Sequence, residues 1–181
     1  MTTYRKLVIG LLAFTLFNSS DVFLLLKAKQ VGLDDSMVIG VYIFYNLVYA
    51  LFAFPIGAVA DKIGLKKVYL IGLALFAGVY FGMAVNSSPI IFFGLFFLYG
   101  VYAAATEGIS KAWISNLTDK QDTATAIGTY SGFQSICTML ASSLAGFIWF
   151  QFGAAATFIV TGSATLLVIA YFFVTIKTSP K

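Results

Sequence analysis

Two acidic side chains, Asp21 and Glu107, lie within long apolar stretches of this sequence. Ionisable groups inside membrane spans are costly and commonly mark substrate or ion pathways. A protonatable carboxylate at that depth can couple proton binding to the movement of a solute. Each carboxylate also has a structural alternative: Glu107 could pair with Lys111 one turn later, and Asp21 could be capped by Asn18 and Ser20 near the outer interface.

Polar and aromatic side chains form two stripes at helical spacing. The first stripe, at positions i, i+3, i+4 and i+7 of one stretch, consists of Tyr42, Tyr45, Asn46 and Tyr49. Because these positions share one helix face, they predict a cavity wall offering rings and hydroxyl donors, with interhelical packing as the alternative. A weaker stripe contains Tyr130, Gln134 and Cys137.

Together these side chains form the candidate solute and proton pathway. The pathway comprises Asn18, Asp21, Tyr45, Asn46, Tyr49, Glu107, Lys111, Tyr130 and Gln134.

The residue types that the sequence lacks argue against several classes of function. The sequence has no histidine and a single cysteine, Cys137, which argues against His-based triads, zinc sites and an intramolecular disulfide. We therefore expect no catalytic residues, no metal and no cofactor, and an enzyme is the least favoured class. No nucleotide-binding loop is present that would use ATP. No basic patch interleaved with stacking aromatics lies outside the apolar stretches, so we expect no nucleic-acid partner.

The elements that position these residues are membrane-length apolar stretches. Of 181 residues, 60% are hydrophobic and 10% are charged, whereas soluble domains carry about 25% charged residues. The stretches are 7–26, 37–60, 68–85, 90–113, 124–150 and 154–176. Each is close to or above the ~20 residues that a helix needs to cross a bilayer. The predicted fold is an all-α membrane protein, with residues 1–181 forming one domain of six transmembrane helices. We expect the first stretch to be a retained helix, because it is too long for a signal peptide.

The distribution of basic residues predicts the orientation in the membrane. With the N-terminus in the cytoplasm, only Lys27 and Lys29 lie outside. The basic residues inside are then Arg5, Lys6, Lys62, Lys66, Lys67, Lys111, Lys120, Lys177 and Lys181. This bias follows the positive-inside rule and places both termini in the cytoplasm. The predicted inner loops are residues 61–67 and 116–123.

An internal repeat is visible at an offset of 89 residues, where Gly57 and Gly64 recur as Gly146 and Gly153. Asp21 and Glu107 correspond at a similar offset, as do Asn46 and Gln134. Three spans per unit is an odd number, so units of about 1–86 and 87–181 would be inverted relative to each other. Inverted repeats are typical of secondary transporters; coincidence is the alternative, because glycine is common in membrane helices.

The string GAVADKIGLKK at residues 57–67 resembles the signature loop of the major facilitator superfamily, written G-x-x-x-D-R/K-x-G-R/K-R/K. Its matching positions are Gly57, Asp61, Lys62, Gly64, Lys66 and Lys67, although Leu65 delays the basic pair by one position. The strings at 18–26 and 106–112 resemble bacterial members. The resemblance covers essentially the whole chain and is strongest to the C-terminal six-helix half of such transporters.

The resemblance implies a fold and a partner. The family has twelve helices in two halves, so a second six-helix half is expected, either another part of the full chain or a second copy. The first, second, fourth and fifth helices of each half line the central cavity, which makes both polar stripes candidate lining. The signature residues would form a cytoplasmic gating loop, in which Asp61 bonds backbone N–H groups at a helix N-terminus across the two halves.

The resulting expectation is half of a secondary active transporter, a symporter or antiporter, moving a small solute by alternating access. Proton coupling is favoured because carboxylates lie within the spans. Its partners would be the solute, protons and the lipid bilayer, and its location the bacterial inner (plasma) membrane. Two alternatives remain open. One is a non-transporting scaffold or regulatory half. The other is a homo-oligomeric channel with Asp21 or Glu107 lining the pore.

Overall fold

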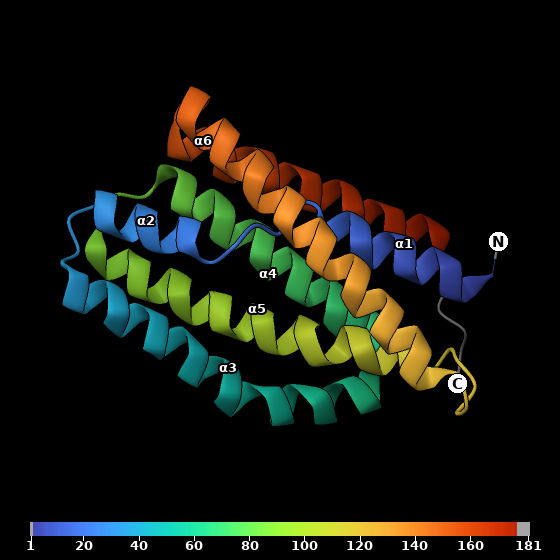
Figure 1. Cartoon of the computed structure of the whole chain (residues 1–181). Helices are drawn as coiled ribbons and strands as arrows, with labels where there is room; N and C mark the ends of the chain where they lie inside the picture. Colours follow the sequence, from blue (N-terminus) through green and yellow to red (C-terminus); the bar gives the residue numbers. More distant parts are fainter. Residues whose placement is uncertain (1, 177–181) are drawn as a thin grey trace.

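A computed structural model describes residues 2–176 as a bundle of α-helices (Figure 1). The helices are α1 (Thr3–Thr15), α2 (Val22–Gln30), α3 (Asp35–Ile63), α4 (Leu65–Val85), α5 (Pro89–Ser115) and α6 (Thr123–Thr175). Lys177 and Lys181, which entered the charge count, lie outside the described residues. Within the described part of the chain, four helices (α3 to α6) are long and apolar enough to cross a membrane. The protein is therefore an integral membrane protein.

Helix α6 contains 53 residues but folds back on itself at Gly153. A straight helix of that length would extend about 80 Å, more than twice the thickness of the hydrocarbon core. Gly153 has φ 86° and ψ 171°, a conformation that glycine adopts without a Cβ clash. The first arm (residues 123–152) and the second arm (154–175) run in opposite directions from this turn and diverge toward the other end of the bundle (Figure 1). Near the turn, the Thr157 hydroxyl is 3.5 Å from the carbonyl oxygen of Ala145. The predicted boundary between the fifth and sixth spans therefore lies at this turn.

The predicted single helix over residues 7–26 is wrong, because the chain leaves the helix after Thr15 and resumes it at Val22. Residues 18–21 are Asn, Ser, Ser and Asp, whose side chains compete with the helix for backbone groups. The break is also bonded to the rest of the bundle, since the Ser142 hydroxyl of α6 accepts from the Ser20 N–H at 3.1 Å. Irregular backbone at membrane depth is tolerated where it is buried in protein or lines a cavity.

The predicted loop over residues 61–67 is reduced to a junction at a single residue. Helix α3 continues to Ile63 and α4 begins at Leu65, with Gly64 between them at φ 99° and ψ 138°. Among residues 2–176, positive φ occurs only at Gly32, Gly64 and Gly153. The last two are 89 residues apart. Because glycine reverses the chain here without further residues, Asp61 stays in the last turn of α3 and the lysines at 66 and 67 start α4.

The ends of the helices gather at two ends of the bundle. The start of α1, the Gly64 junction, the α5–α6 connection and the end of α6 lie at one end, whereas the α2–α3 and α4–α5 connections and the Gly153 turn lie at the other (Figure 1). Lys66 at the first end donates a hydrogen bond to the carbonyl of Ile176. The described lysines and Arg5 that were assigned to the cytoplasm lie on segments at this same end, away from Lys27 and Lys29.

Helix α4 lies at the centre of the bundle and packs mainly against α5 and α6. Its Phe76 and Tyr80 are fully buried, and they stack on each other with ring centroids 4.0 Å apart. Helix α3 lies at the edge and packs mainly on α5 (Figure 1). The two helices are in close contact at Gly100, where a Cβ would lie 2.6 Å from the carbonyl oxygen of Tyr45. This contact sets the position of Tyr45 relative to the break before α2.

Candidate functional site

The Asp21 carboxylate, at the start of α2, is held by tyrosines from two other helices. Tyr45 of α3 donates its hydroxyl to one carboxylate oxygen. Tyr99 of α5 donates to the other at 2.5 Å. The two tyrosine rings meet edge to face, with centroids 5.3 Å apart, and both are buried. Asp21 thereby joins α2 to α3 and α5, and it bonds neither Asn18 nor Ser20 as a cap would.

Asn18 extends this cluster along α5. Its amide nitrogen donates to the hydroxyl of Tyr102 at 3.1 Å, one turn after Tyr99, and this bond leaves the amide oxygen directed elsewhere. In the described residues, the buried side-chain atoms without a hydrogen-bond partner are Asn18 Oδ1, Ser19 Oγ and Tyr80 Oη. Leaving such a group unsatisfied costs about 1–3 kcal/mol. The Ser19 and Tyr80 hydroxyls lie within reach of each other, so Asn18 Oδ1, in the break beside Asp21, is the buried acceptor that a polar ligand could satisfy.

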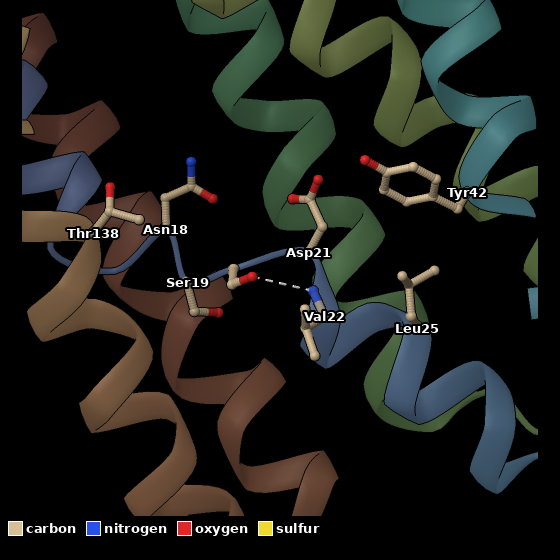
Figure 2. A pocket seen from close by; sticks show the side chains of 8 residues that line it. Asn18, Ser19, Asp21, Val22, Leu25, Tyr42 and Thr138 are labelled. Atoms are coloured by element: carbon tan, nitrogen blue, oxygen red, sulfur yellow. Dashed lines mark hydrogen bonds between the residues drawn. The ribbon is translucent and has the colours of Figure 1, made fainter. Parts of the chain in front are cut away.

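A cavity of about 350 Å³ opens at this break (Figure 2). Its lining consists of Asn18, Ser19, Ser20, Asp21, Val22, Leu25, Tyr42 and Thr138. Figure 2 shows the Tyr42 hydroxyl directed toward the Asp21 carboxylate, with Asn18 and Thr138 on the opposite side. The volume is at the lower end of the range for small-molecule sites, about 300–1,000 Å³.

A second, smaller cavity of about 210 Å³ lies between α3 and α5, toward the Gly64 junction. Its lining consists of Tyr49, Ala53, Gly57, Asp61, Leu65, Ala104, Gly108, Ile109 and Ala112. Beside it, the Tyr49 hydroxyl is within electrostatic reach of the Glu107 carboxylate. Glu107 and Lys111 are both exposed and form no ion pair with each other. Glu107 thus faces α3 instead of being neutralised within its own helix.

The remaining candidates are dispersed. Asn46 donates its amide to the carbonyl of Tyr42 in its own helix at 2.9 Å. Tyr130 is buried in the core, and Gln134 is half-buried on the first arm of α6, outside both cavities. Lys62 and Lys67 are exposed, whereas Lys66 lies over the ring of Phe173 at 5.8 Å. The signature residues are therefore divided: Gly57 and Asp61 line the second cavity, and Lys66 contacts α6.

Sequence reasoning missed four residues that complete the Asp21 site: Tyr99 and Tyr102 on α5, and Thr138 and Ser142 on α6. The two tyrosines are spaced i and i+3, and Thr106 follows Tyr102 by one turn, so a polar face on α5 was visible in the sequence. The two α6 residues carry no comparable signal. Within residues 2–176, no group of three Asp, Glu, His or Cys side chains is placed to hold a metal ion.

The chain is similar to known membrane transport proteins. A family model described as Major Facilitator Superfamily matches residues 7–181. An uncharacterized MFS-type transporter of Methanocaldococcus jannaschii is 37% identical over 142 residues, covering 75% of this chain and 36% of the relative. A multidrug transporter of Candida glabrata is 27% identical over 121 residues, covering 65% of this chain and 20% of that protein. The matches thus span about a third and a fifth of the lengths of these relatives.

Proposed function

This chain belongs to the Major Facilitator Superfamily, and we propose that it is a six-helix half of a secondary transporter that moves a small solute by alternating access, driven by protons. The observation that carries this proposal is the cavity at Asp21. There, the chain leaves the helix between α1 and α2, and the Asp21 carboxylate is held by tyrosines of two neighbouring helices. Broken helices of this kind form substrate and ion sites in transporters.

The proposed architecture is one domain over residues 1–181 with two inverted three-helix units. In the first unit the interrupted α1–α2 pair acts as one span and is followed by α3 and α4. In the second, α5 is followed by the two arms of α6. The positive φ at both Gly64 and Gly153 supports this division, because each glycine joins the second and third spans of its unit. Both chain termini would then face the cytoplasm of a bacterial inner membrane.

A second six-helix half would complete the transporter, supplied either by the rest of a longer chain or by a second copy. The exposed apolar side chains of α3, including Ile43, Leu47 and Leu51, offer a surface for it. The mass of the purified chain in mild detergent separates the two sources: a homodimer requires twice the mass of one chain.

The proposed proton carriers are Asp21 and Glu107, each of which faces a tyrosine hydroxyl of α3. Asp21 would respond to the solute directly because it lines the larger cavity. Glu107 lies beside the smaller cavity with Tyr49, nearer the end of the bundle that carries the signature residues. The rest of the proposed pathway comprises Asn18, Tyr45, Asn46, Lys111, Tyr130 and Gln134.

The proposal is tested by reconstituting the assembly that mild detergent preserves into vesicles containing a pH-sensitive dye. A panel of amines, carboxylates, sugars and amino acids is then added outside. We expect at least one solute to change the internal pH at a saturable rate, because solute and proton movements are coupled. Vesicles without protein serve as the control.

The alternatives give different results in the same preparation. A channel would show unitary conductance in planar bilayers, abolished by neutralising Asp21 or Glu107. A scaffold or regulatory half would show neither conductance nor solute-dependent pH change. Either result would contradict the transporter proposal.

The signature residues are proposed to gate the cytoplasmic side, with Asp61 holding one access state closed by bonding across the two halves. Asp61→Ala is then expected to lower the solute-dependent flux about tenfold, the effect of losing roughly 1.4 kcal/mol from one state. Flux is divided by the amount of protein inserted in the vesicles. The matched control is Asp119→Ala, an exposed acid in the α5–α6 connection at the same end of the bundle. Parallel losses of flux and insertion would refute the gating role.

A further inference from the structure

The cavity at Asp21 carries an uncompensated negative charge. Asp21 is the acidic residue among its lining residues, and no lysine or arginine lines it. Within residues 2–176, no ion pair joins Asp21 to a basic side chain, and Lys29 of α2 is instead paired with Asp35 at 2.6 Å. The two tyrosine hydroxyls occupy one acceptor position on each carboxylate oxygen. A carboxylate has about four such positions, so capacity remains for a ligand.

The oxygen atoms around the carboxylate favour a ligand that donates hydrogen bonds. Asn18 Oδ1 is a carbonyl oxygen and can only accept, and the amide nitrogen of the same side chain already donates to Tyr102. Asn18 Oδ1 is buried without a partner, and the Ser19 hydroxyl, whose near neighbour is the Tyr80 hydroxyl, keeps a lone pair that can accept from a ligand. Ser19 is nine-tenths or more buried, and both residues line the cavity. A primary ammonium group supplies three donors and no acceptor, which matches the Asp21, Asn18 and Ser19 oxygens.

Aromatic rings lie on the opposite side of the carboxylate. Tyr42 lines the cavity and meets Tyr45 edge to face, with ring centroids 5.4 Å apart. Tyr45 in turn meets Tyr99. Packing of one aromatic ring on another contributes about 0.5–1.5 kcal/mol beyond the area buried, so the Tyr42 ring favours a ligand with an aromatic or apolar part. Leu25 and Val22 add an apolar surface for the remainder of a ligand.

The size and lining of the cavity favour an organic cation over a bare metal ion or an anion as its ligand. A volume of about 350 Å³ is far larger than the roughly 10–15 Å³ of free space that one water molecule needs. Hard cations need several oxygens at about 2.3–2.6 Å around one point, and within residues 2–176 no group of three Asp, Glu, His or Cys side chains is placed to hold one. An anion would meet the Asp21 charge with no basic side chain to offset it.

We propose that the cavity at the α1–α2 break binds a small organic cation, with its primary ammonium group on Asp21, Asn18 and Ser19 and its apolar part against Tyr42 and Leu25. This inference rests on the proposed function, because the bound cation would be the solute that the site transports. The inference adds to the proposed function the chemical class of the transported solute.

The test measures equilibrium binding to the purified chain in lipid nanodiscs, where no gradient exists. The probe is benzylammonium, with benzyl alcohol and benzoate as neutral and anionic probes of matched shape. We expect benzylammonium to bind at least about tenfold more tightly than either. Asp21→Asn should weaken its binding by about tenfold or more. Asp119→Asn, the same substitution in the exposed α5–α6 connection, should leave binding unchanged.

A second pair of variants keeps the test decisive if Asp21→Asn fails to fold. Tyr42→Leu should weaken benzylammonium binding about threefold through loss of the ring contact with the benzyl group, whereas Tyr42→Phe should retain it. Equal binding of benzyl alcohol, or unchanged benzylammonium binding in both Asp21→Asn and Tyr42→Leu, would overturn the proposal. So would Asp21-dependent binding of Na⁺ without binding of benzylammonium.

The results also distinguish this inference from the transporter proposal. Asp21-dependent binding of benzylammonium without any solute-driven flux would support the cation site and contradict transport. Flux of solutes that lack an amine, in a protein that does not bind benzylammonium, would support transport and overturn the cation site.

Discussion

Replacing Gly100 with alanine is expected to lower the free energy of unfolding by about 2 kcal/mol, the cost of overpacking a closed contact. The new Cβ would lie 2.6 Å from the carbonyl oxygen of Tyr45 and 2.8 Å from the Cβ of Val48. A backbone carbonyl cannot rotate away as a side chain can, so α3 must move off α5. That movement would also withdraw Tyr45 from Asp21. Denaturant titration in mixed micelles measures the change.

The matched control is Gly94→Ala on the same helix, where an added Cβ meets no atom within 4 Å. Because alanine is favoured over glycine in a helix interior by about 1 kcal/mol, this variant should be unchanged or more stable. The two substitutions therefore have opposite expected signs. Equal stability of both variants would show that α3 and α5 do not meet at Gly100.

Much of the fold was predictable because composition and hydropathy determine it. An all-helical membrane protein follows from the long apolar stretches, and the turn between the fifth and sixth stretches was placed near Gly153. The break at residues 16–21 was not predicted, because a window of membrane length averages four polar residues with their apolar neighbours. Its cause is partly tertiary, since Ser142 of α6 bonds the backbone at Ser20.

The residues of the candidate site were easier to predict than their arrangement in space. Asp21 and Tyr45 were both identified, but their hydrogen bond depends on a helix rotation that no sequence period specifies. The stripe from Tyr42 to Tyr49 was read as one wall, yet seven residues cover about 10 Å of helix. Tyr45 accordingly reaches Asp21, whereas Tyr49 lies by Glu107.

The alternative pairing of Glu107 with Lys111 is not formed, because such pairs contribute only about 0.3–0.5 kcal/mol on a helix surface. Contacts with a neighbouring helix easily outweigh that energy. Tyr99 and Tyr102 were missed because they lie in a stretch rich in phenylalanine, where two further aromatic residues do not stand out. Their role appears only when the polar break of residues 18–21 is placed against α5.

Asp21→Asn is expected to lower solute-dependent proton flux by about 10–100-fold. Hydrogen bonds to a charged group contribute about 1.5–3 kcal/mol, and each 1.4 kcal/mol corresponds to a factor of ten. The substitution also removes the carboxylate that is proposed to carry the proton. Stability should change by less than the flux does, because the asparagine oxygen can still accept from Tyr45 or Tyr99. Flux is measured in dye-loaded vesicles with the solute that gives the largest signal for the unmodified protein.

The most direct test of the account is this flux per molecule of inserted protein, compared between the unmodified chain, Asp21→Asn and the exposed-site control Asp119→Asn. If the cavity at Asp21 lies on the transport path, Asp21→Asn should insert normally and lose the solute-dependent flux, while Asp119→Asn should retain it. A fully active Asp21→Asn variant would show that the cavity at the helix break does not lie on the transport path.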